Sequence, residues 1–489
     1  MEDEQITQEL KALIQAGVFM DPLLMNTYFE ARALPTWDRV QADTDGMYRK
    51  YAQVHYFLTD LGDIPFSPRL LRRCLVETVM STAVYIANET SGAVIPTDDH
   101  LVTAEDRVED WIEIRGIGSL YKLYFVIAGY DFLQPMFFHR HVYEADFLNG
   151  ARHYPYTPDA LDDYLMAALA RGSVRIKSHR CGRVIQPTKV GINRFHLIRQ
   201  SLEESGYLAK RIAMSYVYQF DTIEDWDALC NIVWPNAVVL RQSFLDWSSI
   251  ESDQNVLEVG CGTGALTFDC GLADRVLPGG HVTAIDVSSG MLDQARRKYT
   301  SYGSVNHVEL TQASVEHLPY DDNTFDACIG SAVLHFTDAK RSVAEMTRVV
   351  RKDGIVSVLQ ALAMNTFGPF FTEWFQPVLE LARKNRRTGA GDYLPTEADV
   401  RSWFTQAGLT DIKVQIVDAS WVFDSPEVVV QHIVRGVSFF QAEMVYLPWD
   451  DQRTLISELI DRGRDVCRHY PLSERIIQLP TVFIRGRKP

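Results

Sequence analysis

Short apolar runs alternate with amphipathic stretches from about residue 221 onward. The runs rich in β-branched residues and leucine predict strands at Val256–Val259, His281–Ile285, Val305–Leu310, Ala327–Gly330 and Gly354–Leu359. Helical periodicity predicts helices between them at Leu266–Ala273, Ser289–Tyr299 and Lys340–Arg351. Further helices are expected at Thr396–Ala407, Pro426–Glu443 and Asp450–His469, with strands near Ile412–Val417 and at Ile477–Ile484. Strands that alternate with helices predict an α/β fold, a parallel sheet with helices on both faces.

Residues 151–220 have a different pattern. Thr157 and Pro158 begin a helix that runs to Ala170, and two short apolar runs, Val174–Lys177 and Arg183–Gln186, flank a loop as in a hairpin. A second helix is expected from Lys189 to Ser205, before Gly206. Helix, hairpin and helix in this order are similar to part of a winged-helix module.

The first 150 residues mix helix-like and strand-like stretches, which predicts an α+β region of no family that we identify. Leu70–Asn88 has the pattern of a buried helix, and Ile114–Ala128 fits a strand or a buried helix equally. We therefore expect three parts: residues 1–150, a winged-helix-like segment and connector at 151–220, and an α/β domain at 221–489.

Charge and composition restrict the partners of this chain. It has 489 residues with 48 basic and 64 acidic side chains, a formal net charge of −16. Such a surface repels nucleic-acid phosphates, and the only modest basic patch is Arg171–Arg183, so we expect no nucleic-acid partner. No apolar run has the length of a membrane span, and the acidic start, Met1–Glu4, is unlike a secretory signal. Seven cysteines without a CxxC pair are typical of a reducing compartment, so the expected location is cytoplasmic.

A glycine-rich turn follows the first strand of the α/β domain, in the sequence VLEVGCGTGAL (256–266). Gly260, Gly262 and Gly264 allow a sharp turn and close approach to a ligand, at the start of a predicted helix whose N–H groups are free. The spacing is GxGxG, whereas the dinucleotide fingerprint is GxGxxG. Glu258 would repel a pyrophosphate, but it suits a ligand with a cationic sulfonium and an ammonium group.

An acidic residue ends the second strand, in the sequence AIDVS. Asp286 stands where a carboxylate in a doubly wound sheet accepts hydrogen bonds from ribose hydroxyls; the alternative is that it caps the next helix. Met291, one turn into that helix, fits an adenine face or ordinary packing.

These motifs resemble the class I S-adenosylmethionine-dependent methyltransferases, particularly the branch of ubiquinone and menaquinone C-methyltransferases and many natural-product enzymes. The resemblance covers about residues 220–489. It also depends on ASVEHLPYDDNTFD (313–326), GSAVLHF (330–336), EMTRVVRKDGIV (345–356), the AGL turn at Ala407 and the GRKP end at Gly486.

The resemblance implies a Rossmann-like doubly wound sheet with an antiparallel last strand, and S-adenosyl-L-methionine as cofactor. It implies that Gly260–Gly264, with Cys261, surround the methionyl group beside Glu258, and that Asp286, next to Val287, binds the ribose. It places Ser314 and Val315 at the adenine edge and Ser331 and His335 near the methyl group. Where this chain has Ser314 the family often has aspartate, so the contact with the adenine amino group is expected to be weaker.

His335 is the catalytic candidate, as a general base for a hydroxyl or carbon acceptor; the alternative is that it only positions the cofactor or a helix. The segment with His139, His141 and Glu144 could place two metal ligands on one strand face, but no third strong ligand is near, and we expect no metal site. Tyr216, Tyr218 and Phe220 could close over the cofactor or simply pack.

The sequence thus predicts methyl transfer to a small molecule, as in natural-product biosynthesis. It does not determine whether the acceptor atom is oxygen, carbon or nitrogen. One alternative is an enzyme that uses the sulfonium charge in a cyclisation or rearrangement. Another is a ligand-sensing regulator whose winged-helix-like segment binds DNA. In small-molecule methyltransferases such segments usually cap the substrate site and dimerise, so a homodimer through the N-terminal regions is expected.

Overall fold

The structure is a computed structural model, and it describes residues 2–15, 123, 126–127, 129–139, 141–149, 158–212, 220, 223–302, 306–364, 368–384, 394–437, 440, 443–444, 447 and 449–489. The chain divides into two compact units. The first consists of residues 1–87, 95–215 and 445–454, and the second of residues 88–94, 216–444 and 455–489. Within the described ranges, every helix is too short or too polar to cross a membrane.

The second unit is built on a seven-stranded sheet of order β6-β5-β4-β7-β8-β10-β9. Its strands are β4 (Asn255–Val259), β5 (His281–Asp286), β6 (Val308–Gln312), β7 (Phe325–Ser331), β8 (Val350–Ala361), β9 (Thr410–Val422) and β10 (Ile476–Arg487). Strands β4 to β8 pair in parallel, whereas β10 lies between β8 and β9 and is antiparallel to both. The predicted α/β, Rossmann-like sheet with an antiparallel last strand is therefore confirmed.

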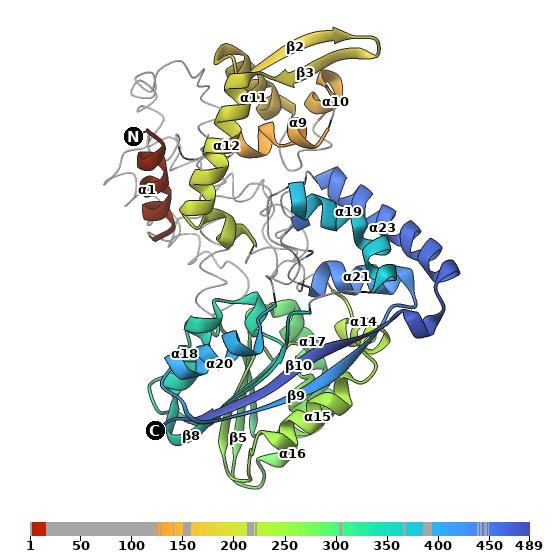
Figure 1. The fold of residues 1–489 in the computed structure, drawn as a ribbon. Helices are drawn as coiled ribbons and strands as arrows, with labels where there is room; N and C mark the ends of the chain where they lie inside the picture. Colours follow the sequence, from red (N-terminus) through yellow and green to blue (C-terminus); the bar gives the residue numbers. More distant parts are fainter. Residues whose placement is uncertain are drawn as a thin grey trace. The chain divides into compact units, whose positions relative to one another are not determined.

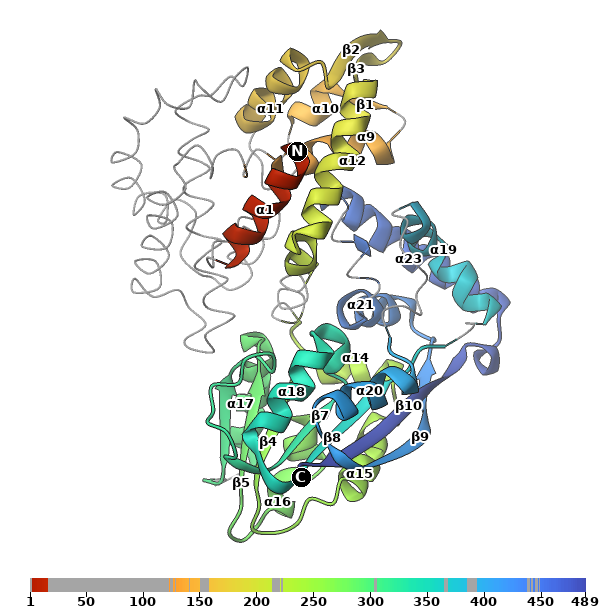
Figure 2. The same ribbon diagram turned by 60° about the vertical axis from the view of Figure 1, so that its left-hand side comes forward.

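Helices cover both faces of this sheet (Figure 1) (Figure 2). On one face, α15 (Ala237–Trp247), α16 (Leu272–Arg275) and α17 (Ser289–Tyr302) bury residues such as Phe244 and Leu292. On the other, α18 (Ala339–Val349) and α20 (Glu397–Gln406) bury Val343 and Phe404. The inner strands β4, β5 and β7 are buried on both sides and are therefore rich in apolar residues, whereas the edge strand β6 is partly exposed.

Three predicted elements differ from the structure. The helix expected at 266–273 is a single π-helical turn at Ala265–Asp269, and Gly271, with φ of 83°, separates it from α16. The helix expected up to Arg351 ends at Val349, because β8 begins at Val350. The helix expected up to Glu443 is α21, which ends at Gly436.

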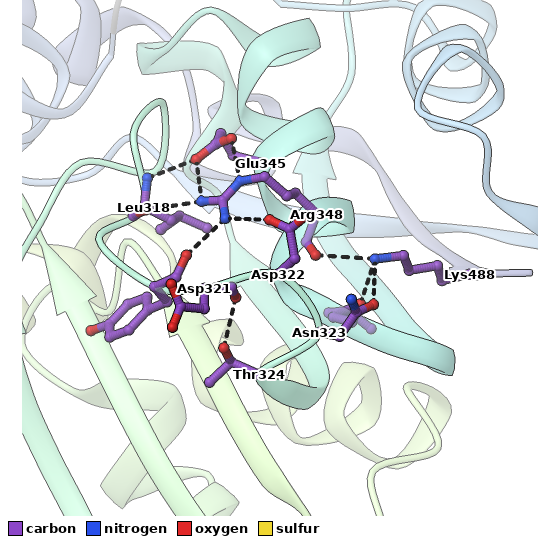
Figure 3. A network of polar contacts seen from close by, with 10 residues as sticks. Leu318, Asp321, Asp322, Asn323, Thr324, Glu345, Arg348 and Lys488 are labelled. Atoms are coloured by element: carbon purple, nitrogen blue, oxygen red, sulfur yellow. Dashed lines mark hydrogen bonds and ion pairs between the residues drawn. The ribbon is translucent and has the colours of Figure 1, made fainter.

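A network of polar contacts fastens the loop before β7 to α18 (Figure 3). Arg348 donates to both carboxylate oxygens of Glu345 at 2.8 and 2.9 Å and to the carbonyl oxygens of Leu318 and Tyr320 at 2.9 and 2.7 Å. Nearby, the ammonium group of Lys488 donates to the carbonyl oxygens of Arg348 and Val350. The motifs at 313–326, 345–356 and 486–489 thus hold one another in place.

Further helices surround the sheet in this unit: α14 (Trp226–Val233), α19 (Pro369–Lys384), α21 (Pro426–Gly436) and the part of α23 (Trp449–His469) that follows residue 454. Trp374 of α19 is fully buried, and its indole N–H donates to the carbonyl oxygen of Leu459 in α23 at 2.8 Å. Gly463 leaves room for this ring, since a Cβ there would lie 2.2 Å from it.

The first unit contains the helix, hairpin and helix expected at 157–205. They are α11 (Pro158–Ala170), β2 (Val174–His179), β3 (Gly182–Pro187) and α12 (Lys189–Glu204), and β1 (Val142–Tyr143) pairs with β3. The other described helices of this unit are α1 (Glu2–Gln15), α9 (Pro135–Phe138) and α10 (Glu144–Leu148). The helix predicted at 70–88 lies outside the described residues. Of the ambiguous segment 114–128, the described residues Leu123, Val126 and Ile127 are helical and buried.

Candidate functional site

The glycine turn lies at the carboxyl end of β4, where β5 and β7 flank it on opposite sides and the strand order reverses. Ligands of doubly wound sheets bind at this point. Gly260, Gly262 and Gly264 have φ of 64°, 54° and 76°, a left-handed conformation that other residues adopt at a cost. A Cβ at Gly260 would lie 2.5 Å from Val333 and one at Gly264 2.6 Å from Phe268, but one at Gly262 would enter open space. The middle glycine therefore faces the side on which a ligand would lie.

Glu258 lies below this turn and is 2% exposed. Its carboxylate accepts a hydrogen bond from the hydroxyl of Thr267 in the π-helical turn. Burial raises the pKa of Glu258 to about 7, although the Thr267 hydrogen bond and the charge of Arg241 act to lower it. Glu258 therefore changes its charge near neutral pH.

Asp286 joins the glycine turn to the end of β5. Its two carboxylate oxygens accept from the backbone N–H groups of Gly262 at 2.9 Å and Ser288 at 2.8 Å. The hydroxyl of Ser288 accepts from the N–H of Met291 in the first turn of α17, so the cap of this helix is Ser288 and not Asp286. A carboxylate oxygen has lone pairs for more than one donor, and Asp286 is only partly buried.

The residues expected around adenine lie beyond the ends of β5 and β6. Met291 is 2% exposed and Val315 is 4% exposed, whereas Val287 and Ser314 are partly buried. The hydroxyl of Ser314 accepts from the N–H of Glu316 at 3.2 Å. This arrangement brings apolar and polar side chains to the same edge of the sheet as Asp286.

Arg241, which no sequence motif singled out, also reaches this site. From α15 its guanidinium lies 4.8 Å from the centre of the Trp234 ring, and its Nε donates to the hydroxyl of Ser331 at 3.3 Å. The guanidinium also contacts the thiol of Cys230, and among the described residues the side chain forms no ion pair. A partly buried cation without a counter-ion, close enough to Glu258 to influence its pKa, is suited to bind an anion.

Helix α14 is fastened to the glycine turn. Asp227 accepts from the hydroxyl of Thr263 at 2.8 Å and pairs with Lys298 of α17 at 2.7 Å. The side chain of Gln294 accepts from the N–H of Trp226 at 3.0 Å and donates to the carbonyl oxygen of Ile223 at 2.8 Å. These contacts place α14 beside the same edge of the sheet.

His335 lies on a short 3₁₀ turn after β7, partly buried, with its Nδ1 3.1 Å from the amide nitrogen of Gln360 in β8. The amide oxygen of Gln360 lies 3.5 Å from the same Nδ1, so this contact is compatible with either tautomer of the neutral ring. Burial lowers the pKa of His335 to about 4. A neutral imidazole with so low a pKa is a weak base, so His335 is better suited to hold a ligand in position than to accept its proton.

The other candidates have separate surroundings. His139 pairs with Asp451 at 2.8 Å, Glu144 pairs with Arg183 at 2.9 Å, and the ring of His141 packs 4.7 Å from that of His179. In the described part of the chain, no group of three potential ligands is arranged to hold a metal ion. The Cys261 thiol is buried, which raises its pKa well above the ordinary value.

Of the three aromatic residues before the domain, Tyr216 and Tyr218 lie outside the described residues. Phe220 packs edge-on against Trp226 at 5.5 Å and against Phe336 at 5.3 Å. Phe220 thus lies between α14 and the turn that carries His335.

Comparison with known proteins agrees with this geometry, since residues 257–358 match the family model described as "Methyltransferase domain". The chain contains a class I methyltransferase domain. It is similar to the demethylmenaquinone methyltransferase of Lactobacillus johnsonii, 34% identical over 121 residues, which are 24% of this chain and 49% of that protein. Thus the chain spans about half the length of this relative. The enzyme of the same name from Staphylococcus epidermidis is 26% identical over 220 residues, 42% of this chain and 89% of that protein. A solved methyltransferase from Aquifex aeolicus is 20% identical with a TM-score of 0.30, over 40% of this chain and 93% of that one.

The cofactor of the methyltransferase domain is S-adenosylmethionine. The described residues fit its charges. Its methionyl end carries an ammonium and a carboxylate, and the site offers the Glu258 carboxylate and the Arg241 guanidinium, which has no counter-ion among the described residues. Its ribose hydroxyls need acceptors such as the Asp286 oxygens. The open space beside Gly262 leaves room for the methionyl group.

Proposed function

We propose that this chain transfers the methyl group of S-adenosylmethionine to a small organic molecule. The observation that carries the proposal is the presence of two opposite charges at one edge of the sheet. Glu258 and Arg241 lie near the glycine turn, and the guanidinium forms no ion pair among the described residues. A zwitterionic amino acid needs both charges, whereas a pyrophosphate would be repelled by Glu258.

Each residue at this edge has a role in that proposal. Asp286 accepts from the ribose hydroxyls, while Val287, Met291, Ser314 and Val315 border the adenine. Gly260, Cys261, Gly262 and Gly264 form the turn around the methionyl group. When bound, the cofactor supplies an electrophilic methyl group, and the protein contributes mainly orientation and exclusion of water, worth up to about 7–11 kcal/mol.

Ser331 and His335 border the position of the methyl group in this proposal. Because Gln360 holds the ring and burial keeps it neutral, we assign His335 a positioning role, as a hydrogen-bond partner of the acceptor molecule or the cofactor. The variant His335→Gln is expected to raise KM for the acceptor more than it lowers kcat. A general base would instead show a large loss of kcat and a changed pH profile.

The test is incubation of the full chain with methyl-labelled S-adenosylmethionine and small-molecule extracts. Label in a low-molecular-weight product, together with S-adenosylhomocysteine, supports the proposal. Label only in protein or nucleic acid contradicts the small-molecule part, and a product of unchanged mass contradicts methyl transfer.

For the first unit, the proposed role of the winged-helix-like segment predicted at 151–220 is self-association, in a cytoplasmic homodimer without a nucleic-acid partner. The order of helix, hairpin and helix supports it. Light scattering on the full chain should give twice the monomer mass, and gel shifts at physiological salt should show no duplex binding. A monomer that binds duplex DNA would contradict this role.

A further inference from the structure

Strand β9 is the outermost strand of the seven-stranded sheet (Figure 2). One of its sides pairs with β10, and its other side meets no strand among the described residues. The strand has 13 residues, and its charged side chains are those of Asp411, Lys413 and Asp418. Natural sheet edges are usually shorter, covered or more highly charged, because their unpaired N–H and C=O groups attract another strand. An edge of this kind is suited to pair with a further strand.

Two contacts show which backbone groups of β9 point away from β10. The N–H of Ser420 donates to the side-chain oxygen of Asn236 at 3.2 Å, so it faces outward. Opposite Asp418, Pro480 of β10 uses its carbonyl oxygen on the β8 side, where it accepts from the N–H of Leu362. The backbone groups of Asp418 are therefore not bonded to β10 and also face outward.

The same direction holds for Ile416 and Val414, because the hydrogen-bonding groups of a strand alternate between its two sides. Among the described residues, the outward N–H and C=O groups of Val414, Ile416 and Asp418 have no hydrogen-bond partner. This free stretch ends on one side at Ser420, whose N–H is already bound. On the other side it ends at a shift of register next to Asp411, which has φ of 46°. The free stretch, Val414–Asp418, is thus symmetrical about Ile416.

Exposed apolar side chains flank the free stretch. Ile416 is 46% exposed, although Val482, opposite it in β10, is buried. On α15, Val239 is 64% exposed and lies three residues after Asn236, on the side of the helix that reaches β9. A pair of strands alone buries less surface than a stable dimer needs, and these side chains add apolar surface beside the strand.

From these observations we infer that the edge of β9 pairs with the same edge of a second copy of this chain. An antiparallel pair about a two-fold axis at Ile416 brings the two Ile416 side chains together and sets Val414 opposite Asp418 of the partner subunit. Each of these pairs can exchange both of its hydrogen bonds, and no charged side chain stands opposite another. A strand of another protein would need no such symmetry. The edge belongs to the homodimer proposed above, so the expected mass is still twice that of the monomer.

The first test measures the dissociation constant of the dimer by sedimentation velocity on the full chain over a range of concentrations. Ile416→Lys places two like charges at the axis and should raise this constant at least about tenfold. Leu472→Lys is the matched control, because Leu472 is 43% exposed on a short turn, and it should leave the constant unchanged. Both variants should bind S-adenosylhomocysteine as wild type does, which shows that they are folded and keeps this test separate from the proposed function.

The second test is a disulfide cross-link that reports the register. In the register above, the α-carbons of the two residues at position 416 lie about 5.5 Å apart, within the range of a disulfide. A Cys181→Ser background removes an exposed thiol, and in it Ile416→Cys should form a covalent dimer on mild oxidation. Asp418→Cys is the matched control, since in the same register it lies roughly 13 Å along the strand from its own copy. It should remain a monomer on a denaturing gel.

Three results would overturn the inference. A full chain that is monomeric at every concentration would exclude a second copy, and an extended segment of another protein would then be the occupant of this edge. Equal dissociation constants for wild type and Ile416→Lys would place the dimer contact elsewhere. Cross-linking of Asp418→Cys as readily as Ile416→Cys would exclude the two-fold axis at Ile416. The cross-link needs no lysine variant, so it decides the question even if Ile416→Lys fails to fold.

Discussion

Replacing Arg241 should weaken cofactor binding specifically through the carboxylate of the methionyl group. The guanidinium is held by the Trp234 ring at 4.8 Å and by Ser331 at 3.3 Å, it contacts the Cys230 thiol, and it forms no ion pair among the described residues. A hydrogen bond to a charged group contributes about 1.5–3 kcal/mol, and partial exposure lowers that figure. We therefore expect Arg241→Gln to cost about 2 kcal/mol, which is roughly thirtyfold in Kd.

The assay is calorimetric titration with two ligands that differ only in this group. S-adenosylhomocysteine carries the carboxylate, and its decarboxylated analogue S-adenosyl-3-thiopropylamine keeps the ammonium but lacks it. Arg241→Gln should lose about thirtyfold for the first ligand and almost nothing for the second. Arg241→Lys should fall between wild type and Arg241→Gln, because lysine keeps the charge but not the planar fork or the stacking on Trp234.

Arg275→Gln serves as the control, since Arg275 pairs with Asp246 on α15, and it should change neither Kd. Equal losses for both ligands would mean that Arg241 acts through the fold, and no loss for either would mean that the carboxylate binds elsewhere. Both results would refute the reasoning.

Three further predictions follow from single side chains. Glu258 has a pKa of about 7 in the free protein, and the ligand ammonium favours its ionised form, so the Kd of S-adenosylhomocysteine should rise by up to tenfold per pH unit as the pH falls below 7. Calorimetry in two buffers of different ionisation enthalpy should show that protons are released on binding. A Glu258→Gln variant with the same pH dependence would contradict this. Arg348→Ala removes the contacts to Glu345 and to the loop before β7, which should lower the free energy of unfolding by about 2 kcal/mol and the unfolding temperature by about 4–8 °C. The control Arg464→Ala, at an exposed ion pair, should change the unfolding temperature little. Similar shifts for both variants would show that the network is not stabilising. Gly262→Ala should cost about 1 kcal/mol of stability from its positive φ yet lose most cofactor affinity, and unchanged affinity would place the ligand away from this turn.

The inner strands were predictable because both of their faces are buried. Val256, Val282 and Ala327 are all 0% exposed, so alternation with polar residues is absent and the apolar runs are visible in the sequence. Asp286 was found for a related reason, since the position that follows such a run is fixed at the carboxyl edge of the sheet.

Other features could not be read from the chain. Arg241 lies on an ordinary amphipathic helix, and only the fold brings it to Ser331, 90 positions later. Trp226 and His432 form no pattern, because their contact depends on the packing of α14 on α21. The break at Gly271 was missed, as a single glycine in an apolar stretch is compatible with a continuous helix.

Calorimetric titration of the full wild-type chain with S-adenosylhomocysteine and, separately, with a nicotinamide dinucleotide tests the central claim most directly. The account predicts one molecule of S-adenosylhomocysteine bound per chain, lost in Asp286→Ala, and no heat with the dinucleotide. Binding of the dinucleotide without binding of S-adenosylhomocysteine would contradict it.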